Sequence, residues 1–430
     1  MRIILSKAEE LFLSWAKKAA VPIELSWTSS LSSFACDLVE SQLRDKKIVF
    51  LGEPDHFVIE KYQYQLSFLR RLHELGWNLV GKEIGRSDGE RINRFIQTGN
   101  ESCLNSVVLF GASDSNGAVR RMSPAGLMSP VPDSGVSSFR SAEIQLARAL
   151  RDLAKSADIG GSIRFFGFDI DIFPGGALAD ITELLAQSTD LGVSAQLLAN
   201  LAPRPGETVS DERMRLEHAF KQAQLLEGRL EMSIGIDDTK ALIGTLQNWL
   251  NGVEFLERAF LNPTREELWS AFAYREHTMI REVCDLLSDN NISKKLVLLG
   301  HNMHLTKKSD QITSFNLCGQ QVPMWNSVGT YIAEKFRDQV FSVWMLCGSG
   351  THSGPHFSSS QQSFSNLDLF VEAILSSVPW HAFCLPLSSA PNIVLESLSE
   401  TMFGCNGEPA QGSLRAQADM IVFIREVTAL

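Results

Sequence analysis

Five short runs of apolar residues constrain the fold of this chain most strongly. They cover residues 47–53 (KIVFLGE), 78–84 (NLVGKEI), 163–169 (IRFFGFD), 295–301 (KLVLLGH) and 341–347 (FSVWMLC). Each run is almost continuously apolar instead of alternating between apolar and polar residues. Such a run is typical of a strand that is buried on both faces of a parallel sheet. Residues 420–423 (MIVF) predict one further strand near the end.

Stretches with helical periodicity lie between these runs. In residues 60–75, Tyr64, Phe68 and Leu72 recur every four residues and form one apolar stripe. Residues 89–97, 141–155 and 326–337 show similar patterns. The alternation of strand and helix predicts an α/β fold, in which a mainly parallel central sheet is flanked by helices.

The middle of the chain has almost no strand-like run. Residues 177–202, 211–232, 237–260 and 264–287 read as long helices, and Asn262-Pro263 separates the last two because the residue before proline disfavours the helical conformation. We therefore expect a single domain over residues 1–430, with an α/β core at 45–175 and 290–430. The helical insertion at 177–287 is expected to form a bundle or a cap that encloses a substrate. Residues 113–138 and 348–366 are expected to be long loops.

The composition excludes several classes of partner. Fifty acidic residues against 39 basic ones give a net charge of -11, which disfavours nucleic acids and anionic membranes. No stretch approaches the ~18 apolar residues of a membrane span, and charges at Lys7 and Glu9 interrupt any signal peptide. The seven cysteines are scattered and form no CxxC pair. These features favour a cytoplasmic enzyme with a small-molecule substrate, and they leave its oligomeric state open.

Acidic and histidine side chains follow four of the predicted strands. Glu53 and His56 follow the first, Glu83 closes the second, Asp169 ends the third, and the segment HNMH, with His301 and His304, ends the fourth. Active sites of open α/β sheets lie beyond the carboxyl ends of the strands. We therefore expect these side chains to meet at one edge of the sheet.

Glu53 and His56 have the spacing of an acid–base pair. A carboxylate that accepts one imidazole N–H fixes the tautomer and raises the basicity of the other ring nitrogen. An equally simple interpretation is a histidine packed near a helix start beside a salt-bridged glutamate. His301 and His304 could hold a metal, bond a substrate oxygen or be satisfied by loop carbonyls. A carboxylate at Glu83 is costly in an apolar strand unless it is paired or functional.

Several familiar catalytic devices are missing from the sequence. The chain has no GxSxG elbow in a strand-to-helix context, no GxxxxGK[ST] loop, no GxGxxG after a strand and no HExxH helix. The remaining chemistry is acid–base activation of water, with or without a metal. No cofactor is indicated.

The ordered motifs resemble the erythromycin esterase family. The resemblance rests on LGEPDH at residues 51–56 followed by Glu60, the strand that ends at Glu83, and Asn93 and Gly99. It continues with GFD at residues 167–169, REHTM at 275–279, GHNMH at 300–304, SVG at 327–329 and the strand with its glycine-rich turn at 341–350. These segments keep the order of the family and span residues 45 to 350.

This resemblance implies an α/β core with a helical insertion, and hydrolysis of an ester or macrolactone by water that a histidine activates. The best-known members of the family need no metal, whereas relatives in the wider superfamily use one. Transferred to this chain, the resemblance makes His56 the general base, Glu53 and Glu83 its supporting carboxylates and His301 a further member of the catalytic group. The residues expected to contact substrate are His304, Glu60, Asp169 and Arg275.

Three residues around His56 depart from the family pattern. Pro54 and Asp55 replace a small residue and a threonine or serine, and Phe57 replaces a glycine. Our leading hypothesis is a metal-independent hydrolase of an ester, lactone or amide of a small natural product, as in antibiotic resistance. The departures leave open a biosynthetic enzyme that performs cyclisation, acyl transfer or lyase chemistry, and a binding or resistance protein without turnover. A metal-dependent hydrolase that uses His56, Glu83, His301 and His304 is a further alternative.

Overall fold

The computed structural model describes residues 6–105, 107, 112–113, 119–122, 128–130, 136–156, 161–171, 175–202, 204, 207–260, 265–288, 295–315, 321–353, 361–405 and 408–430. The chain divides into two compact units. The first unit contains residues 1–83, 137–164 and 285–430, and the second contains residues 84–136 and 165–284.

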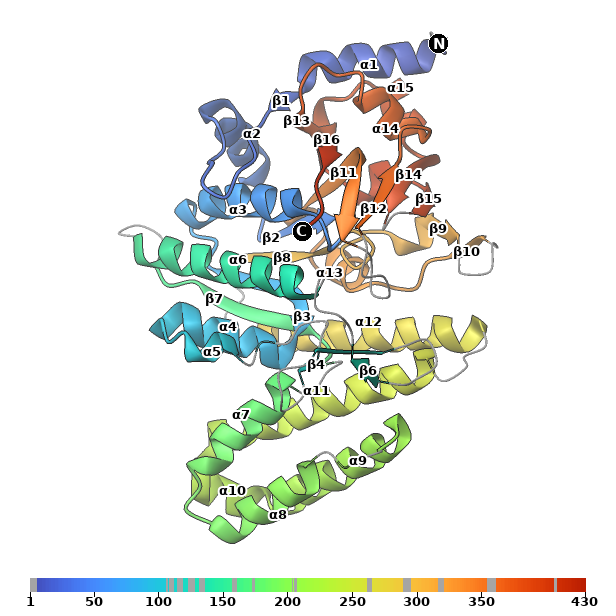
Figure 1. The fold of residues 1–430 in the computed structure, drawn as a ribbon. Coiled ribbons are helices and arrows are strands. Elements are labelled where there is room, and N and C mark those ends of the chain that lie inside the picture. The colour runs from blue at the N-terminus through green and yellow to red at the C-terminus, as the bar shows by residue number, and fades with distance from the viewer. Residues whose placement is uncertain are drawn as a thin grey trace. The chain divides into compact units, whose positions relative to one another are not determined.

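A mostly parallel sheet forms the centre of the first unit (Figure 1). Its strands lie in the order β1, β13, β16, β11, β2, β8, β3, and β12 pairs with β11. The pairs from β16 through β11, β2 and β8 to β3 are parallel, whereas β1 with β13, β13 with β16 and β11 with β12 are antiparallel. The strands are β1 (Val21–Pro22), β2 (Ile48–Glu53), β3 (Leu79–Gly85), β8 (Leu296–His301), β11 (Val340–Ser353), β12 (Gln361–Ser365), β13 (Ala382–Pro386) and β16 (Met420–Val427).

Helices cover both faces of this sheet. Trp344, Phe383 and Phe423 face one side, where they pack in one core with Phe12 of α1 and Leu375 of α14. On the other side α3 contacts β16. The helices of this unit are α1 (Lys7–Ala19), α2 (Ser33–Leu43), α3 (Ile59–Glu74), α6 (Val136–Ser156), α13 (Val328–Phe336), α14 (Phe370–Leu375), α15 (Asn392–Ser397) and α16 (Leu414–Gln417).

The chain also forms a second, smaller sheet, which the periodicity of the sequence did not predict. A four-stranded antiparallel sheet lies in the order β10, β9, β15, β14. Its strands are β9 (Ile312–Phe315), β10 (Gln321–Pro323), β14 (Thr401–Cys405) and β15 (Glu408–Gly412). These strands are three to five residues long, too short for a period of two to stand out from the sequence.

The predicted loop at residues 348–366 is in part a β-hairpin. β11 continues to Ser353 and pairs antiparallel with β12, from Ser349 opposite Ser365 to Ser353 opposite Gln361. Serine and glycine have low strand propensity, and pairing to a neighbouring strand overrides it here. Residues 354–360 of that predicted loop lie outside the described residues.

Most of the predicted loop at 113–138 also lies outside the described residues. The described residues in and next to it form a small sheet of β4 (Ala112–Ser113), β5 (Val119–Met122) and β6 (Met128–Pro130).

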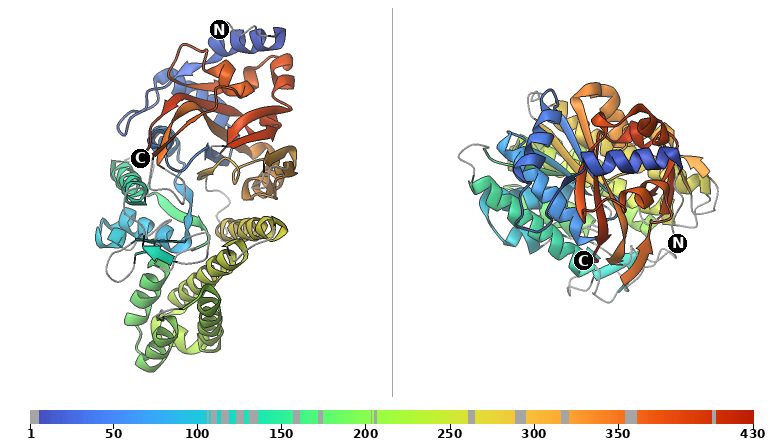
Figure 2. Two further views of the ribbon diagram at one scale, coloured as in Figure 1. Left: turned by 45° about the vertical axis from the view of Figure 1, so that its right-hand side comes forward. Right: turned by 90° about the horizontal axis from the view of Figure 1, so that it is seen from above.

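The second unit is largely helical (Figure 2). Its helices are α4 (Arg86–Thr98), α5 (Ser102–Asn105), α7 (Gly175–Ala186), α8 (Leu191–Leu201), α9 (Val209–Leu225), α10 (Glu227–Ile234), α11 (Ile236–Phe260) and α12 (Arg265–Ser288), and β7 (Arg164–Asp169) leads into it. Residues such as Leu197, Leu216 and Trp249 form the core of α7 to α11. The helix expected over 177–202 is two helices, because Asp190 caps a new one by accepting from the Val193 N–H. The helix expected over 211–232 also divides, at Leu226.

The predicted α/β class is confirmed, with a mainly parallel sheet and helices on both of its faces. A role of the inserted helices as a cap remains a prediction. No helix in the described part of the chain is long and apolar enough to cross a membrane.

Glu372 gives this core a pH-dependent stability. The side chain is fully buried in α14, where its Oε1 accepts the Gly404 N–H at 2.7 Å, and burial raises the pKa of Glu372 to about 8. The folded state therefore holds a proton that the unfolded chain loses near pH 4.5, so the free energy of unfolding falls as the pH rises from about 4.5 to 8. We expect Glu372→Gln to flatten this decline. The urea midpoints of both proteins at pH 5 and pH 9 check this. If the midpoint falls by the same amount between the two pH values in both proteins, the prediction is contradicted.

Candidate active site

The ends of three adjacent parallel strands carry the acid and histidine groups to one place in the first unit. Glu53 at the end of β2 lies opposite His301 at the end of β8, and Glu83 lies near the end of β3. Gly52 permits the close packing at this edge, since a Cβ there would lie 2.2 Å from Asn302 Oδ1. Asn302 in turn donates from its N–H to the Glu53 carbonyl oxygen and from Nδ2 to the Met345 carbonyl oxygen.

Glu53 and His56 form a direct hydrogen bond. Nδ1 of His56 lies 2.6 Å from Oε1 of Glu53, whose side chain is 1% exposed, whereas that of His56 is 12% exposed. Although burial alone would raise the pKa of Glu53, Lys61 and the hydrogen bond from His56 hold it well below its usual range. An ionised carboxylate only accepts hydrogen bonds, so Nδ1 of His56 carries the proton. In the neutral ring, the lone pair is therefore on Nε2.

Glu83 lies on the Nε2 side of His56. Its Oε1 is 3.7 Å from Nε2 of His56 and 3.0 Å from Nε2 of His304. Its Oε2 accepts the backbone N–H of His301 at 2.7 Å. The carboxylate is thus fixed by β8 and by the loop that follows it. A backbone hydrogen bond to a buried carboxylate favours its ionised form.

His301 has both ring nitrogens engaged. Nε2–H donates to the Pro54 carbonyl oxygen at 3.0 Å, and Nδ1 accepts the Met303 N–H at 3.2 Å. Burial, reinforced by repulsion from His56, lowers the pKa of His301 to about 4, so the ring is neutral at neutral pH. Its ring centroid lies 5.4 Å from that of His56. This arrangement ties the turn that carries His56 to the end of β8.

Backbone contacts hold His304 in place. The His304 carbonyl oxygen accepts the N–H of Gly329 at 2.8 Å, next to the start of α13. A Cβ on Gly329 would lie 2.6 Å from the Leu305 carbonyl carbon, so only glycine allows this approach. The sequence GHNMH and the later SVG segment are therefore parts of one local structure.

A buried network of charges surrounds Glu53. Lys61 of α3, 1% exposed, donates from Nζ to Glu53 Oε1 at 2.8 Å, and Gln65 donates from Nε2 to Oε2 at 2.8 Å. Behind this pair, Lys82 lies 3.2 Å from Glu143, which also accepts from the Tyr62 hydroxyl at 2.8 Å. Each charged side chain of the network is therefore paired, as buried charges require.

Two of the three departures around His56, Asp55 and Phe57, have structural counterparts. Asp55 is buried, its Oδ1 accepts the Phe57 N–H at 2.7 Å, and its Oδ2 lies 2.6 Å from Nδ1 of His352 on β11. The hydrogen bond to Asp55 raises the pKa of His352 above its usual value. Phe57 is also buried, with its ring 5.5 Å from that of Phe139 and edge-on to that of His56. The turn is therefore braced by an ion pair and an aromatic contact.

The other predicted substrate contacts, Glu60, Asp169 and Arg275, each have a hydrogen-bond partner within their own unit. Glu60 is in the first unit, and its Oε2 accepts the Thr428 N–H at 2.8 Å. Asp169 and Arg275 are in the second unit, where Arg275 Nε donates to Asp169 Oδ1 at 2.9 Å. The structure therefore brings together Glu53, His56, Glu83, His301 and His304 in the first unit, and it joins Asp169 and Arg275 in a buried ion pair within the second unit.

Sequence reasoning missed Lys61, Gln65 and His352. A signal for the first two was present, because positions 61 and 65 lie on the same helical face as Phe68 and Leu72. Two polar residues on a predicted apolar stripe indicate buried partners. For His352 there was no such signal, since its contact with Asp55 joins positions that are 297 residues apart.

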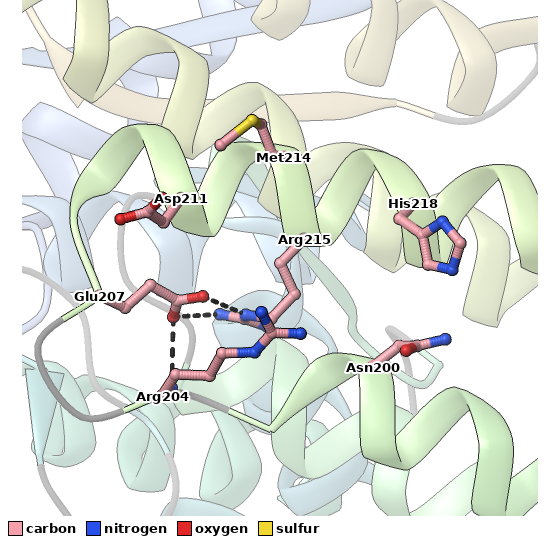
Figure 3. Close-up of a pocket in the computed structure, with 7 residues that line it drawn as sticks. All are labelled: Asn200, Arg204, Glu207, Asp211, Met214, Arg215 and His218. Atoms are coloured by element: carbon pink, nitrogen blue, oxygen red, sulfur yellow. Dashed lines mark hydrogen bonds and ion pairs between the residues drawn. The ribbon is translucent and has the colours of Figure 1, made fainter.

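A separate hollow of about 420 Å³ lies between α8 and α9 in the second unit (Figure 3). It is lined by Asn200, Arg204, Glu207, Asp211, Met214, Arg215 and His218. Arg215 donates from Nε to Glu207 at 2.7 Å and from Nη1 to the Leu201 carbonyl oxygen at 2.8 Å. These bonds hold the connection between the two helices.

Among the described residues, no three His, Cys, Asp or Glu side chains are placed to share a metal ion.

Comparisons with known proteins agree on one family and one fold. The sequence model described as "Erythromycin esterase" matches residues 72–427. No curated protein matches the chain. A solved structure described as a succinoglycan biosynthesis protein has a TM-score of 0.67 at 13% identity and covers 99% of both chains. A protein from Bacillus cereus has a TM-score of 0.66 at 14% identity, covering 98% of both. A variant of the erythromycin esterase EreC in its open conformation has a TM-score of 0.60 at 15% identity, with 93% of this chain and 95% of that one covered.

Proposed function

The chain belongs to the erythromycin esterase family, and from this membership and the geometry of its site we propose that it hydrolyses an ester or lactone of a small natural product. The observation that carries the proposal is the hydrogen bond of 2.6 Å between Glu53 and His56, with Glu83 on the other side of the imidazole. This arrangement fixes one tautomer of a histidine that remains in part exposed. A histidine of this kind is suited to act as a general base.

In the proposed reaction, His56 Nε2 accepts a proton from a water molecule as the water oxygen attacks the ester carbonyl carbon. The imidazolium that forms is stabilised by the carboxylates of Glu53 and Glu83, one near each ring nitrogen. When the tetrahedral intermediate collapses, the proton returns from Nε2 to the departing alkoxide. The products are a carboxylic acid and an alcohol, and His56 regains its neutral form.

The remaining histidines are proposed to orient this group. His301 is neutral and has both nitrogens engaged, so its role is to hold the Pro54 carbonyl and thereby the turn before His56. His304 contacts Glu83 at 3.0 Å and fixes the direction of that carboxylate. Water placed beside Nε2 of His56 and Oε1 of Glu83, which are 3.7 Å apart, would contact both atoms.

A panel of esters tests the proposal. It contains macrolactones, small lactones, aryl esters and alkyl esters, and acid release is followed at constant pH with the whole chain. We expect release of one acid per ester cleaved with at least one class, and unchanged activity after dialysis against a chelator. Intact ligands bound without turnover across the panel would favour a binding protein. Loss of activity on chelation, restored by metal, would favour the metal-dependent alternative.

A further inference from the structure

Lys61 lies next to the proposed catalytic pair without touching the imidazole. Its Nζ donates to the same oxygen, Oε1 of Glu53, that His56 Nδ1 contacts. The two bonds measure 2.6 and 2.8 Å, so the two nitrogens lie at most 5.4 Å apart. At that separation inside a protein, a unit charge on Lys61 acts strongly on the charge state of the ring.

Burial lowers the pKa of Lys61, whereas the neighbouring carboxylate of Glu53 and two aromatic rings favour its charged form. The Nζ atom lies 4.5 Å from the centroid of the Tyr62 ring and 5.1 Å from that of Phe139, where a cation is attracted to the aromatic face. Its hydrogen-bond partner Glu53 is held ionised, as described above. A charged lysine and a charged glutamate at 2.8 Å form a pair of no net charge.

We propose that Lys61 is a positioning residue that offsets the charge of Glu53, so that Glu53 orients His56 without locking it in its protonated form. An isolated buried carboxylate would bind a cationic ring tightly, and a ring that keeps its proton cannot accept one from water. With Lys61 on the same oxygen, Glu53 still accepts the Nδ1–H but exerts a weaker net field on the ring. This role rests on the proposed general-base function of His56.

Among the described residues, further charged and titratable groups lie around His56. They come from five elements besides β2 and its turn: Lys61 on α3, Lys82 and Glu83 on β3, Glu143 on α6, His301 and His304 at the end of β8, and His352 on β11, which is paired with Asp55. Lys82 belongs to the same network but lies against Glu143 at 3.2 Å, and its charge acts on Glu53 less than that of Lys61 does. Lys82 is therefore the matched control for removal of a buried lysine.

NMR titration of the histidine rings in the whole chain tests this role without any substrate. The His56 signal is assigned by its absence in His56→Asn. We expect Lys61→Met, which removes the charge and keeps the length of the side chain, to raise the titration midpoint of the His56 ring by about one to two pH units. Lys61→Arg should restore the midpoint of the wild-type protein, and Lys82→Met should move it much less.

The outcomes separate this proposal from the proposed function. A folded Lys61→Met protein whose His56 midpoint stays in place, moves downward, or shifts no more than in Lys82→Met would overturn the role of Lys61, whatever the activity on esters. If Lys61→Met does not fold, Glu53→Gln is compared with the double variant Glu53→Gln/Lys61→Met, and loss of Lys61 should again raise the midpoint. On an ester that the wild-type protein cleaves, the acidic limb of the kcat/KM profile should move by the same amount.

Discussion

Replacing His56 by asparagine should lower kcat/KM by at least ~10²-fold, the usual contribution of a general base. Asparagine keeps a donor near Glu53 Oε1, so the turn and the buried network retain most of their contacts, but it cannot accept a proton at neutral pH. The loss should therefore fall mainly on kcat, with a small change in KM. The measurement is steady-state hydrolysis of the best ester of the panel.

A matched control for this variant is His73→Asn. His73 is also buried, and its Nδ1 lies 2.7 Å from the side-chain oxygen of Asn78, outside the group around Glu53. We expect this variant to cleave the ester at close to the normal rate. Turnover by His56→Asn within a few fold of the wild-type rate would remove His56 from the chemistry, whatever the control shows.

Removing the carboxylate of Glu53 should have the largest effect on stability. The Lys61 side chain is 1% exposed, and in Glu53→Ala it loses its carboxylate partner. A buried charge left without its partner costs about 3–5 kcal/mol. We expect urea unfolding to show a loss of this size. Glu53→Ala/Lys61→Met should recover part of it, because no unpaired cation remains, and the recovery measures the coupling between the two side chains.

A solvent-exposed glutamate on the same helix provides the comparison for this prediction. Glu74 contacts Arg71 at 2.5 Å with its own side chain 58% exposed. Because exposed ion pairs contribute only about 0–1 kcal/mol, Glu74→Ala should change the free energy of unfolding very little. If Glu53→Ala were as mild as Glu74→Ala, Lys61 would be neutral or solvated, and the buried network would have to be reinterpreted.

Most of the α/β core could be predicted from the apolar runs. The runs that carry Glu53, Glu83 and His301 at or near their ends correspond to β2, β3 and β8, because a strand buried on both faces leaves little choice of residue. The polar residues that end such strands are conspicuous, and parallel packing brings them together. This is why five members of the group could be named from the sequence.

The contacts that tune the site could not be predicted in the same way. The pair between Asp55 and His352 depends on how β11 extends past Cys347 into a hairpin, and its serines and glycines resemble a loop. The apolar face of α3 indicates that Lys61 is buried, but only the tertiary structure shows that its partner is Glu53. Such assignments require the tertiary structure, because the partners come from distant segments.

In the proposed reaction, His56 directs water onto an ester carbonyl. A single turnover in H₂¹⁸O, with enzyme in excess over the ester, tests it most directly. We expect the product acid to gain one ¹⁸O and the alcohol none, at a rate that falls by at least ~10²-fold in His56→Asn. An acid without the label, or equal labelling rates in the two proteins, would contradict it.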